Sequence, residues 1–150
     1  MKYKGIVHNI LNDAPFIGGL VIANQCEKNC PGCFNQELRN DAYTMENSCK
    51  HIVSHVKSNG LNEGIILSGL EWSERPDDLS DLVEEALRES LEVMIYTYHD
   101  EGAFFDILPD LKKKPVHIKF GHYDENLMTA NHYSMGVKLA SSNQYIKYFG

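Results

Sequence analysis

The sequence has little positive charge. Its 150 residues include 14 lysines and arginines against 21 aspartates and glutamates, which gives a formal net charge of −7. Binding to DNA or RNA depends on clustered lysine and arginine side chains that neutralise phosphates. The one basic run is Lys112-Lys113-Lys114, which is typical of a solvated turn. We therefore expect no nucleic-acid partner.

The sequence also lacks a long hydrophobic stretch. The longest one, residues 16–23, is too short to span a bilayer as a helix, which takes about 20 apolar residues. The first residues lack the apolar region of a signal peptide. These absences predict no membrane partner and a cytoplasmic location, where structural disulfides are disfavoured. The four cysteines are therefore expected to be metal ligands, redox groups or core residues.

No internal repeat, low-complexity tract or linker divides the chain, and its length suits one domain over residues 1–150. Apolar runs predict strands at 3–7, 16–23, 64–68, 93–98 and 115–120. Apolar residues at helical spacing predict helices at 45–57 (with Thr44 as the cap), from Pro76 onwards, and at 102–111. This alternation indicates an α/β fold with a mostly parallel sheet. Residues beyond Tyr123 show no clear periodicity.

In such a sheet, chemistry gathers at the carboxyl ends of the parallel strands. Three predicted loops follow such ends, at residues 24–35, 69–75 and 99–102. The first of them holds three of the four cysteines, Cys26, Cys30 and Cys33. Thiolates are the natural ligands of iron–sulfur clusters and of zinc, and the intervening Pro31-Gly32 allows the chain to reverse tightly. The triplet therefore predicts a metal centre.

A zinc site is the first alternative to an iron–sulfur cluster, because Cys49 could supply a fourth ligand. However, Cys49 lies on the apolar face of a predicted helix with Ile52 and Val53, where a free cysteine is a common core residue. Three ligands suit a cluster with one open iron better than a closed zinc site. Thiol–disulfide exchange by the Cys30-Pro-Gly-Cys33 pair is a further alternative, although it leaves Cys26 surplus.

The spacing Cys-x3-Cys-x2-Cys resembles the cluster motif of the radical S-adenosylmethionine superfamily. Within it, the chain is similar to the activating proteins of anaerobic ribonucleoside-triphosphate reductase. The similarity is carried by Cys30-Pro-Gly-Cys33-Phe-Asn35, Leu67-Ser68-Gly69-Leu70-Glu71, Ile95-Tyr96-Thr97-Tyr98, residues 118–127 and Ser141-Ser142-Asn143-Gln144. Leu70 and Trp72 replace a glycine and a proline of that family, and no arginine precedes the cysteines, which marks a divergent member.

The resemblance implies a single-domain partial (β/α) barrel of the radical S-adenosylmethionine type. It also implies that Cys26, Cys30 and Cys33 hold a [4Fe–4S] cluster whose open iron binds S-adenosylmethionine. Reductive cleavage would then generate a glycyl radical on anaerobic ribonucleoside-triphosphate reductase, with a flavodoxin-like or other low-potential protein as electron donor. No catalytic side chain beyond the cluster ligands is implied. The residues expected to contact S-adenosylmethionine are Gly32, Cys33, Phe34, Asn35, Ser68, Gly69, Leu70 and Glu71.

Several of these residues have plainer interpretations. Phe34 could be a core residue, and Glu71 could be a solvated loop acid rather than a partner of the ammonium group. Thr97 is a weaker candidate, Tyr98 and Tyr123 are expected to pack on the sheet, and His51 and His55 to form a partly exposed pair. Alternative functions are another small radical enzyme that modifies a peptide or nucleoside, and a non-catalytic zinc-binding interaction module.

Overall fold

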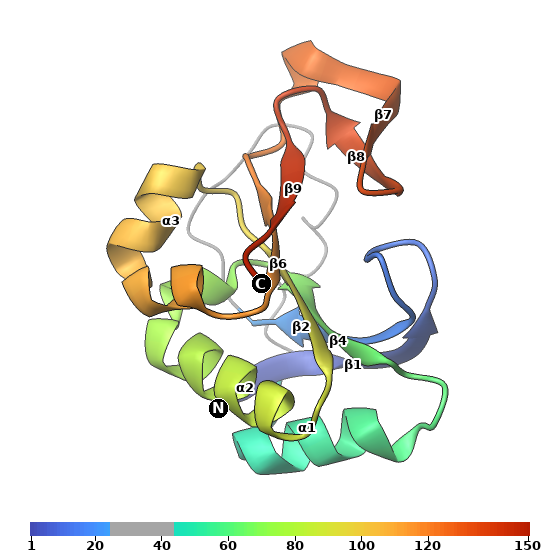
Figure 1. Cartoon of the computed structure of the whole chain (residues 1–150), viewed down its shortest axis with the longest axis vertical. Coiled ribbons are helices and arrows are strands. Elements are labelled where there is room, and N and C mark those ends of the chain that lie inside the picture. Colours follow the sequence, from blue (N-terminus) through green and yellow to red (C-terminus); the bar gives the residue numbers. More distant parts are fainter. Residues whose placement is uncertain (25–43) are drawn as a thin grey trace.

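The computed structural model describes residues 1–24 and 44–150, and its centre is a seven-stranded sheet (Figure 1). The strands of this sheet are β1 (Lys2–Ile10), β2 (Gly18–Ala23), β3 (Met45–Glu46), β4 (Gly64–Gly69), β5 (Glu92–Tyr96), β6 (His117–Phe120) and β9 (Tyr145–Tyr148). Their order across the sheet is β3-β1-β2-β4-β5-β6-β9. Two further strands, β7 (Met128–Ser134) and β8 (Val137–Ser141), form a separate antiparallel hairpin.

The four central strands, β2, β4, β5 and β6, are parallel neighbours. At the edges, β1 runs antiparallel to β2 and β3, and β9 runs antiparallel to β6. The expected α/β fold with a mostly parallel sheet is therefore confirmed. Over the described residues the sheet is open, with β3 and β9 at its two ends, and no closed barrel is formed.

The crossovers of this sheet run through three α-helices of the described chain, α1 (Cys49–Ser58), α2 (Pro76–Arg88) and α3 (Glu101–Ile107). Short 3₁₀ helices lie at Trp72–Glu74, Pro109–Lys113 and Glu125–Leu127. In Figure 1, α1 lies at the bottom of the molecule and the β7–β8 hairpin at the top. None of the helices in the described ranges is long and apolar enough to cross a membrane.

The helix predicted from Met45 begins later than expected. Ser48 is its N-cap, and the Ser48 side chain accepts a hydrogen bond from the backbone N–H of His51 at 3.1 Å. Met45 pairs instead with Tyr3 as part of β3 and remains exposed. The predicted start at residue 45, with Thr44 as the cap, is wrong because pairing with β1 takes these residues and a better cap follows.

The single helix predicted at 102–111 is also wrong. It is divided into α3 and a 3₁₀ helix at Leu108, where the chain turns from one to the other. Pro109 follows directly, and the residue before a proline is sterically disfavoured in the helical region. The break therefore has a local cause that the apolar spacing did not reveal.

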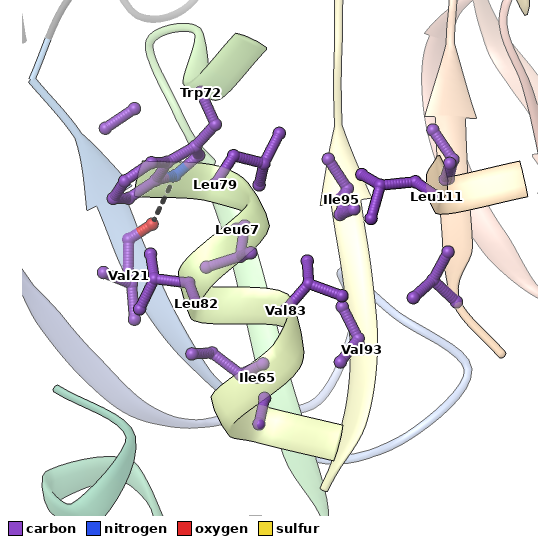
Figure 2. Close-up of a cluster of buried hydrophobic side chains, with 14 of the residues drawn as sticks. Val21, Ile65, Leu67, Trp72, Leu79, Leu82, Val83, Val93, Ile95 and Leu111 are labelled. Atoms are coloured by element: carbon purple, nitrogen blue, oxygen red, sulfur yellow. Dashed lines mark hydrogen bonds between the residues drawn. The ribbon is translucent and has the colours of Figure 1, made fainter. Parts of the chain in front are cut away.

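One face of the sheet packs against the helices and forms the main core (Figure 2). Alternate residues of the strands point to this face, as their period of two requires. Ile65 and Leu67 of β4 and Val93 and Ile95 of β5 are fully buried there. They meet the apolar stripe of α2, made of Leu79, Leu82, Val83 and Ala86.

On the opposite face of the sheet, none of the described helices contributes to the core. Ile66 of β4 and Met94 of β5 point to it and form a second, smaller core. Ala14 from the loop after β1, Val137 and Leu139 from β8, and Ile146 from β9 complete this core. Within residues 1–24 and 44–150, the loop and the hairpin cover part of this face, and a cavity at the carboxyl ends of the strands is the candidate site.

Candidate functional site

The candidate site lies where the parallel strands end. β4 ends at Gly69 and β5 at Tyr96, and the cysteine segment follows the carboxyl end of β2. The cysteine triplet itself lies outside the described residues, as do four of the eight expected S-adenosylmethionine contacts, of which Cys33 is also a member of the triplet. These predicted residues are Cys26, Cys30, Gly32, Cys33, Phe34 and Asn35.

The described residues on either side of the cysteine segment meet each other. The Thr44 hydroxyl donates a hydrogen bond to the Asn24 side-chain oxygen at 2.7 Å. The Lys4 ammonium group also donates to the Thr44 hydroxyl, at 3.3 Å. The chain therefore leaves and re-enters the described fold at one place, beside the carboxyl end of β2.

A cavity of about 740 Å³ opens at this edge of the sheet. Ser68, Gly69, Leu70 and Glu71, the expected contacts in the second loop, all line it. Ligand sites for small molecules are usually about 300–1,000 Å³, so the cavity has the volume of such a site. Four residues chosen from the sequence thus lie together at one cavity wall.

The other walls come from segments far apart in the chain. Thr97 and Tyr98 line the cavity after β5, Tyr123 lines it after β6, and Asn12 and Asp13 line it from the loop after β1. Strands β7 and β8 form a further wall, and the basic side chains that line the cavity are Lys119 and Lys138. The sheet, the loop and the hairpin therefore build the cavity jointly.

Glu71 is buried in this wall, with 3% of its surface exposed. One of its carboxylate oxygens accepts a hydrogen bond from the backbone N–H of Ser73 at 3.2 Å, and the other accepts from the backbone N–H of Tyr98 at 2.8 Å. The interpretation of Glu71 as a solvated loop acid is wrong. Its carboxylate instead joins the loop after β4 to the loop after β5.

Gly69 makes a close approach to β2 possible. Its backbone has φ +94°, and a Cβ atom there would lie 2.5 Å from the Ile22 Cγ2 atom and 2.8 Å from the Ala23 nitrogen. Only glycine adopts this conformation readily and leaves room for the neighbouring strand. Gly69 therefore fixes the end of β4 against the end of β2, next to the cysteine segment.

Trp72, which stands where the resembled family has a proline, holds the same two strand ends together. It is 2% exposed. Its indole N–H donates to the Val21 carbonyl at 3.2 Å, the hydrogen bond drawn in Figure 2, and to the Ser68 carbonyl at 3.1 Å. A proline has no side-chain donor, so a proline at this position could make neither contact.

Tyr96, Lys119 and Asp13 line the cavity but were not predicted as site residues. The Tyr96 hydroxyl donates to the Asp13 carbonyl at 2.6 Å, and the Lys119 ammonium group lies 5.6 Å above the Tyr96 ring. Burial raises the pKa of the Tyr96 hydroxyl, and the Asp13 charge raises it further. Burial also raises the pKa of the Asp13 carboxyl group.

One signal in the sequence could have identified Lys119. The strand His117-Ile118-Lys119-Phe120 alternates polar and apolar residues, so its polar side chains share the face away from the helices. Parallel strands are usually buried on both faces, so a lysine on this predicted strand is unusual and points to a site. Asp13 carries no comparable signal, because an aspartate before Ala-Pro is typical of a turn.

The histidines and Cys49 form no metal site in the described ranges, where no three His, Cys, Asp or Glu side chains gather closely enough to hold an ion. Cys49 is half-buried and packs against the main core. His51 and His55 are exposed, with ring centroids 6.4 Å apart. Both results agree with the expected roles of a core residue and an exposed pair.

The comparison with protein families supports an iron–sulfur protein. The model of the 4Fe–4S single cluster domain matches residues 18–146, from β2 to β9, and defines an iron–sulfur protein. The chain belongs to the 4Fe–4S single cluster domain family. No curated protein matches it.

Proposed function

We propose that this chain is a radical S-adenosylmethionine activase that generates a glycyl radical on anaerobic ribonucleoside-triphosphate reductase. One observation carries the proposal. A chain of the 4Fe–4S single cluster domain family places Ser68-Gly69-Leu70-Glu71 in the wall of a 740 Å³ cavity, at the sheet edge from which its cysteine segment departs.

The three cysteines of the triplet suit a cluster in which one iron has no protein ligand. Cys26, Cys30 and Cys33 supply three thiolates, and a cubane cluster takes four ligands. Cys49 packs against the core from α1, so we do not count it as the fourth ligand. The fourth position is left for S-adenosylmethionine, whose amino and carboxylate groups are suitable iron ligands.

In this proposal, the residues of the cavity wall bind S-adenosylmethionine and orient it. The Ser68–Glu71 loop offers backbone groups to the methionine part of S-adenosylmethionine, while buried Glu71 and Trp72 keep this loop in place. A cluster held by Cys26, Cys30 and Cys33 would pass one electron from a low-potential donor to S-adenosylmethionine. Cleavage of a carbon–sulfur bond would then give methionine and a 5′-deoxyadenosyl radical, which would take a hydrogen atom from the target glycine to leave 5′-deoxyadenosine and a glycyl radical.

The test is anaerobic reconstitution with iron and sulfide. We expect about four irons per chain, 5′-deoxyadenosine that forms only with dithionite, and a glycyl-radical electron paramagnetic resonance signal on co-expressed reductase. Cleavage without that signal would favour another small radical enzyme that acts on a peptide or nucleoside. One zinc per chain and no cleavage would favour the zinc-binding interaction module.

Cysteine variants give a matched control for this test. Cys30→Ala removes one of three proposed ligands and should abolish the cluster absorbance. Cys49→Ala should retain about four irons per chain, since it removes a half-buried side chain that packs against the core. Loss of the cluster in Cys49→Ala would contradict the three-ligand assignment.

A further inference from the structure

The turn after β8, Ser141-Ser142-Asn143-Gln144, belongs to the resemblance but has no part in the function proposed above. Ser141 and Gln144 are buried, whereas Ser142 is exposed. Gln144 also lines the cavity. The buried Gln144 side chain therefore faces the candidate site and needs an explanation.

The Gln144 side chain uses both ends of its amide. Its oxygen accepts hydrogen bonds from the backbone N–H groups of Ala140 at 3.1 Å and Ser141 at 3.2 Å. Its nitrogen donates to the Gly121 carbonyl at 3.2 Å. With 6% of its surface exposed, Gln144 connects the end of β8 to the residue that follows β6.

The Gly121 carbonyl accepts a second hydrogen bond, from the Lys119 ammonium group at 2.8 Å. Gly121 has φ +101°, and a Cβ atom there would lie 3.3 Å from atoms of Asn143 and Gln144. The Asn143 amide nitrogen also donates to the His122 carbonyl at 2.8 Å. The turn thus packs on the Gly121 backbone and determines where its carbonyl points.

Lys119 is the side chain that this carbonyl holds. It is 7% exposed, lines the cavity and lies over the Tyr96 ring. An ammonium group has three N–H donors and no acceptor. A carbonyl acceptor in a fixed position therefore determines where the Lys119 ammonium group lies. A buried cation is costly unless it is paired, and the Gly121 carbonyl is one of the groups that stabilise Lys119 in this position.

From these contacts we infer that Gln144 is a positioning residue. It fixes the Gly121 carbonyl, and the carbonyl fixes the Lys119 ammonium group. The ammonium group lines the cavity and adds to the affinity for S-adenosylmethionine by attracting its carboxylate group. This inference rests on the proposed function, because it takes S-adenosylmethionine as the ligand. It gives the Ser141–Gln144 turn a role in the site without direct contact with the ligand.

The test is a double-mutant cycle on the reconstituted protein without reductant, so that binding is measured and no turnover occurs. The dissociation constant of S-adenosylmethionine is determined for the wild type, Gln144→Glu, Lys119→Met and the double variant. Gln144→Glu keeps the acceptor for Ala140 and Ser141, but it replaces the donor to Gly121 with a carboxylate oxygen that repels this carbonyl. We expect it to weaken binding about tenfold, the equivalent of one lost hydrogen bond.

The effect should depend on Lys119. In the Lys119→Met background, Gln144→Glu should change the dissociation constant by less than about twofold, because the residue through which it acts is gone. Ser142→Ala is the control, since this exposed side chain lies in the same turn, and it should bind as the wild type does. Circular dichroism establishes that each variant is folded.

Two results would overturn the inference in distinguishable ways. Equal weakening by Gln144→Glu in both backgrounds would mean that Gln144 acts on the site without Lys119. A reconstituted wild type that binds no S-adenosylmethionine would remove the proposed function and the inference with it. Gln144→Ala provides a second variant if Gln144→Glu does not fold, and the same dependence on Lys119 is expected of it.

Discussion

The Glu71 carboxylate and the Tyr98 backbone N–H are joined by a 2.8 Å hydrogen bond that links the loops after β4 and β5. The other Glu71 oxygen accepts from the Ser73 N–H. A buried carboxylate that accepts two backbone hydrogen bonds acts as an internal connection between loops, and a hydrogen bond with a charged partner contributes about 1.5–3 kcal/mol. The cavity wall therefore depends on an acidic side chain.

Glu71→Gln should lower the free energy of unfolding by about 1–3 kcal/mol. The amide keeps one acceptor but turns an NH₂ group toward a backbone N–H donor, so one hydrogen bond is lost and two donors face each other. Urea denaturation followed by circular dichroism measures the change. Glu92→Gln, an exposed position in β5, is the control and should change the stability by less than about 0.5 kcal/mol. Equal effects of the two variants would contradict the linking role.

Gly69→Ala should destabilise the protein by more than about 2 kcal/mol. The new methyl group would collide with Ile22 and with the Ala23 nitrogen, and the backbone has a positive φ that alanine adopts poorly. Thermal unfolding measures the change. Gly60→Ala is the matched control, because a Cβ atom there meets nothing within 4 Å. A Gly69→Ala variant as stable as Gly60→Ala would show that the ends of β2 and β4 can separate freely.

Trp72→Phe should cost about 2–3 kcal/mol of stability. The phenyl ring fills less of the core and leaves the Val21 and Ser68 carbonyls without the indole donor. Because Trp72 is the only tryptophan, unfolding must be followed by circular dichroism rather than by tryptophan fluorescence. Tyr133→Phe, at a position 59% exposed, is the control. A loss below about 0.5 kcal/mol for Trp72→Phe would exclude the bridging role of the indole.

Asp13 should make the protein less stable as the pH rises. Burial raises its pKa above the ordinary value of 3.8, so the folded state binds this proton more tightly than the unfolded state does. The contribution of Asp13 to stability is therefore fully present below pH 3.8 and is lost as the pH rises through the higher pKa of the folded state.

Asp13→Asn removes this titration without changing the carbonyl that binds Tyr96. The variant should have a higher melting temperature than the wild type at pH 7, and the difference should shrink toward pH 3.5. Asp81→Asn, an exposed position in α2, should show no such trend. If the difference in melting temperature between Asp13→Asn and the wild type did not change with pH, titration of the Asp13 carboxyl group would be excluded as its cause.

Much of the fold could be predicted from local patterns. The apolar runs located β2, β4, β5 and β6, because buried parallel strands are nearly continuous in apolar residues. The start of α1 could not be found in this way, since residues 45–46 pair with β1, a contact between distant parts of the chain. The hairpin and β9 were missed because half-exposed antiparallel strands near Asn, Ser and Gly have weak periodicity.

The candidate site was predicted only in part, for a related reason. Ser68, Gly69, Leu70 and Glu71 form one continuous loop, so a motif could identify them together. Asp13, Tyr96, Lys119 and Gln144 come from four separate segments, and no local pattern indicates that such residues meet. Glu71 was identified, but its hydrogen bond to Tyr98 depends on how two loops approach each other.

The sequence by itself determined the cysteine triplet, the family and the order of the central elements. Three closely spaced cysteines, the 4Fe–4S single cluster domain match and the alternating apolar runs are all properties of the chain as written. Only the tertiary structure decided that a cavity lies at the ends of the parallel strands, and that Glu71, Lys119 and Gln144 all line it. The reason is physical, because a cavity forms where packing between distant segments is incomplete, and packing is not encoded in any single stretch of residues.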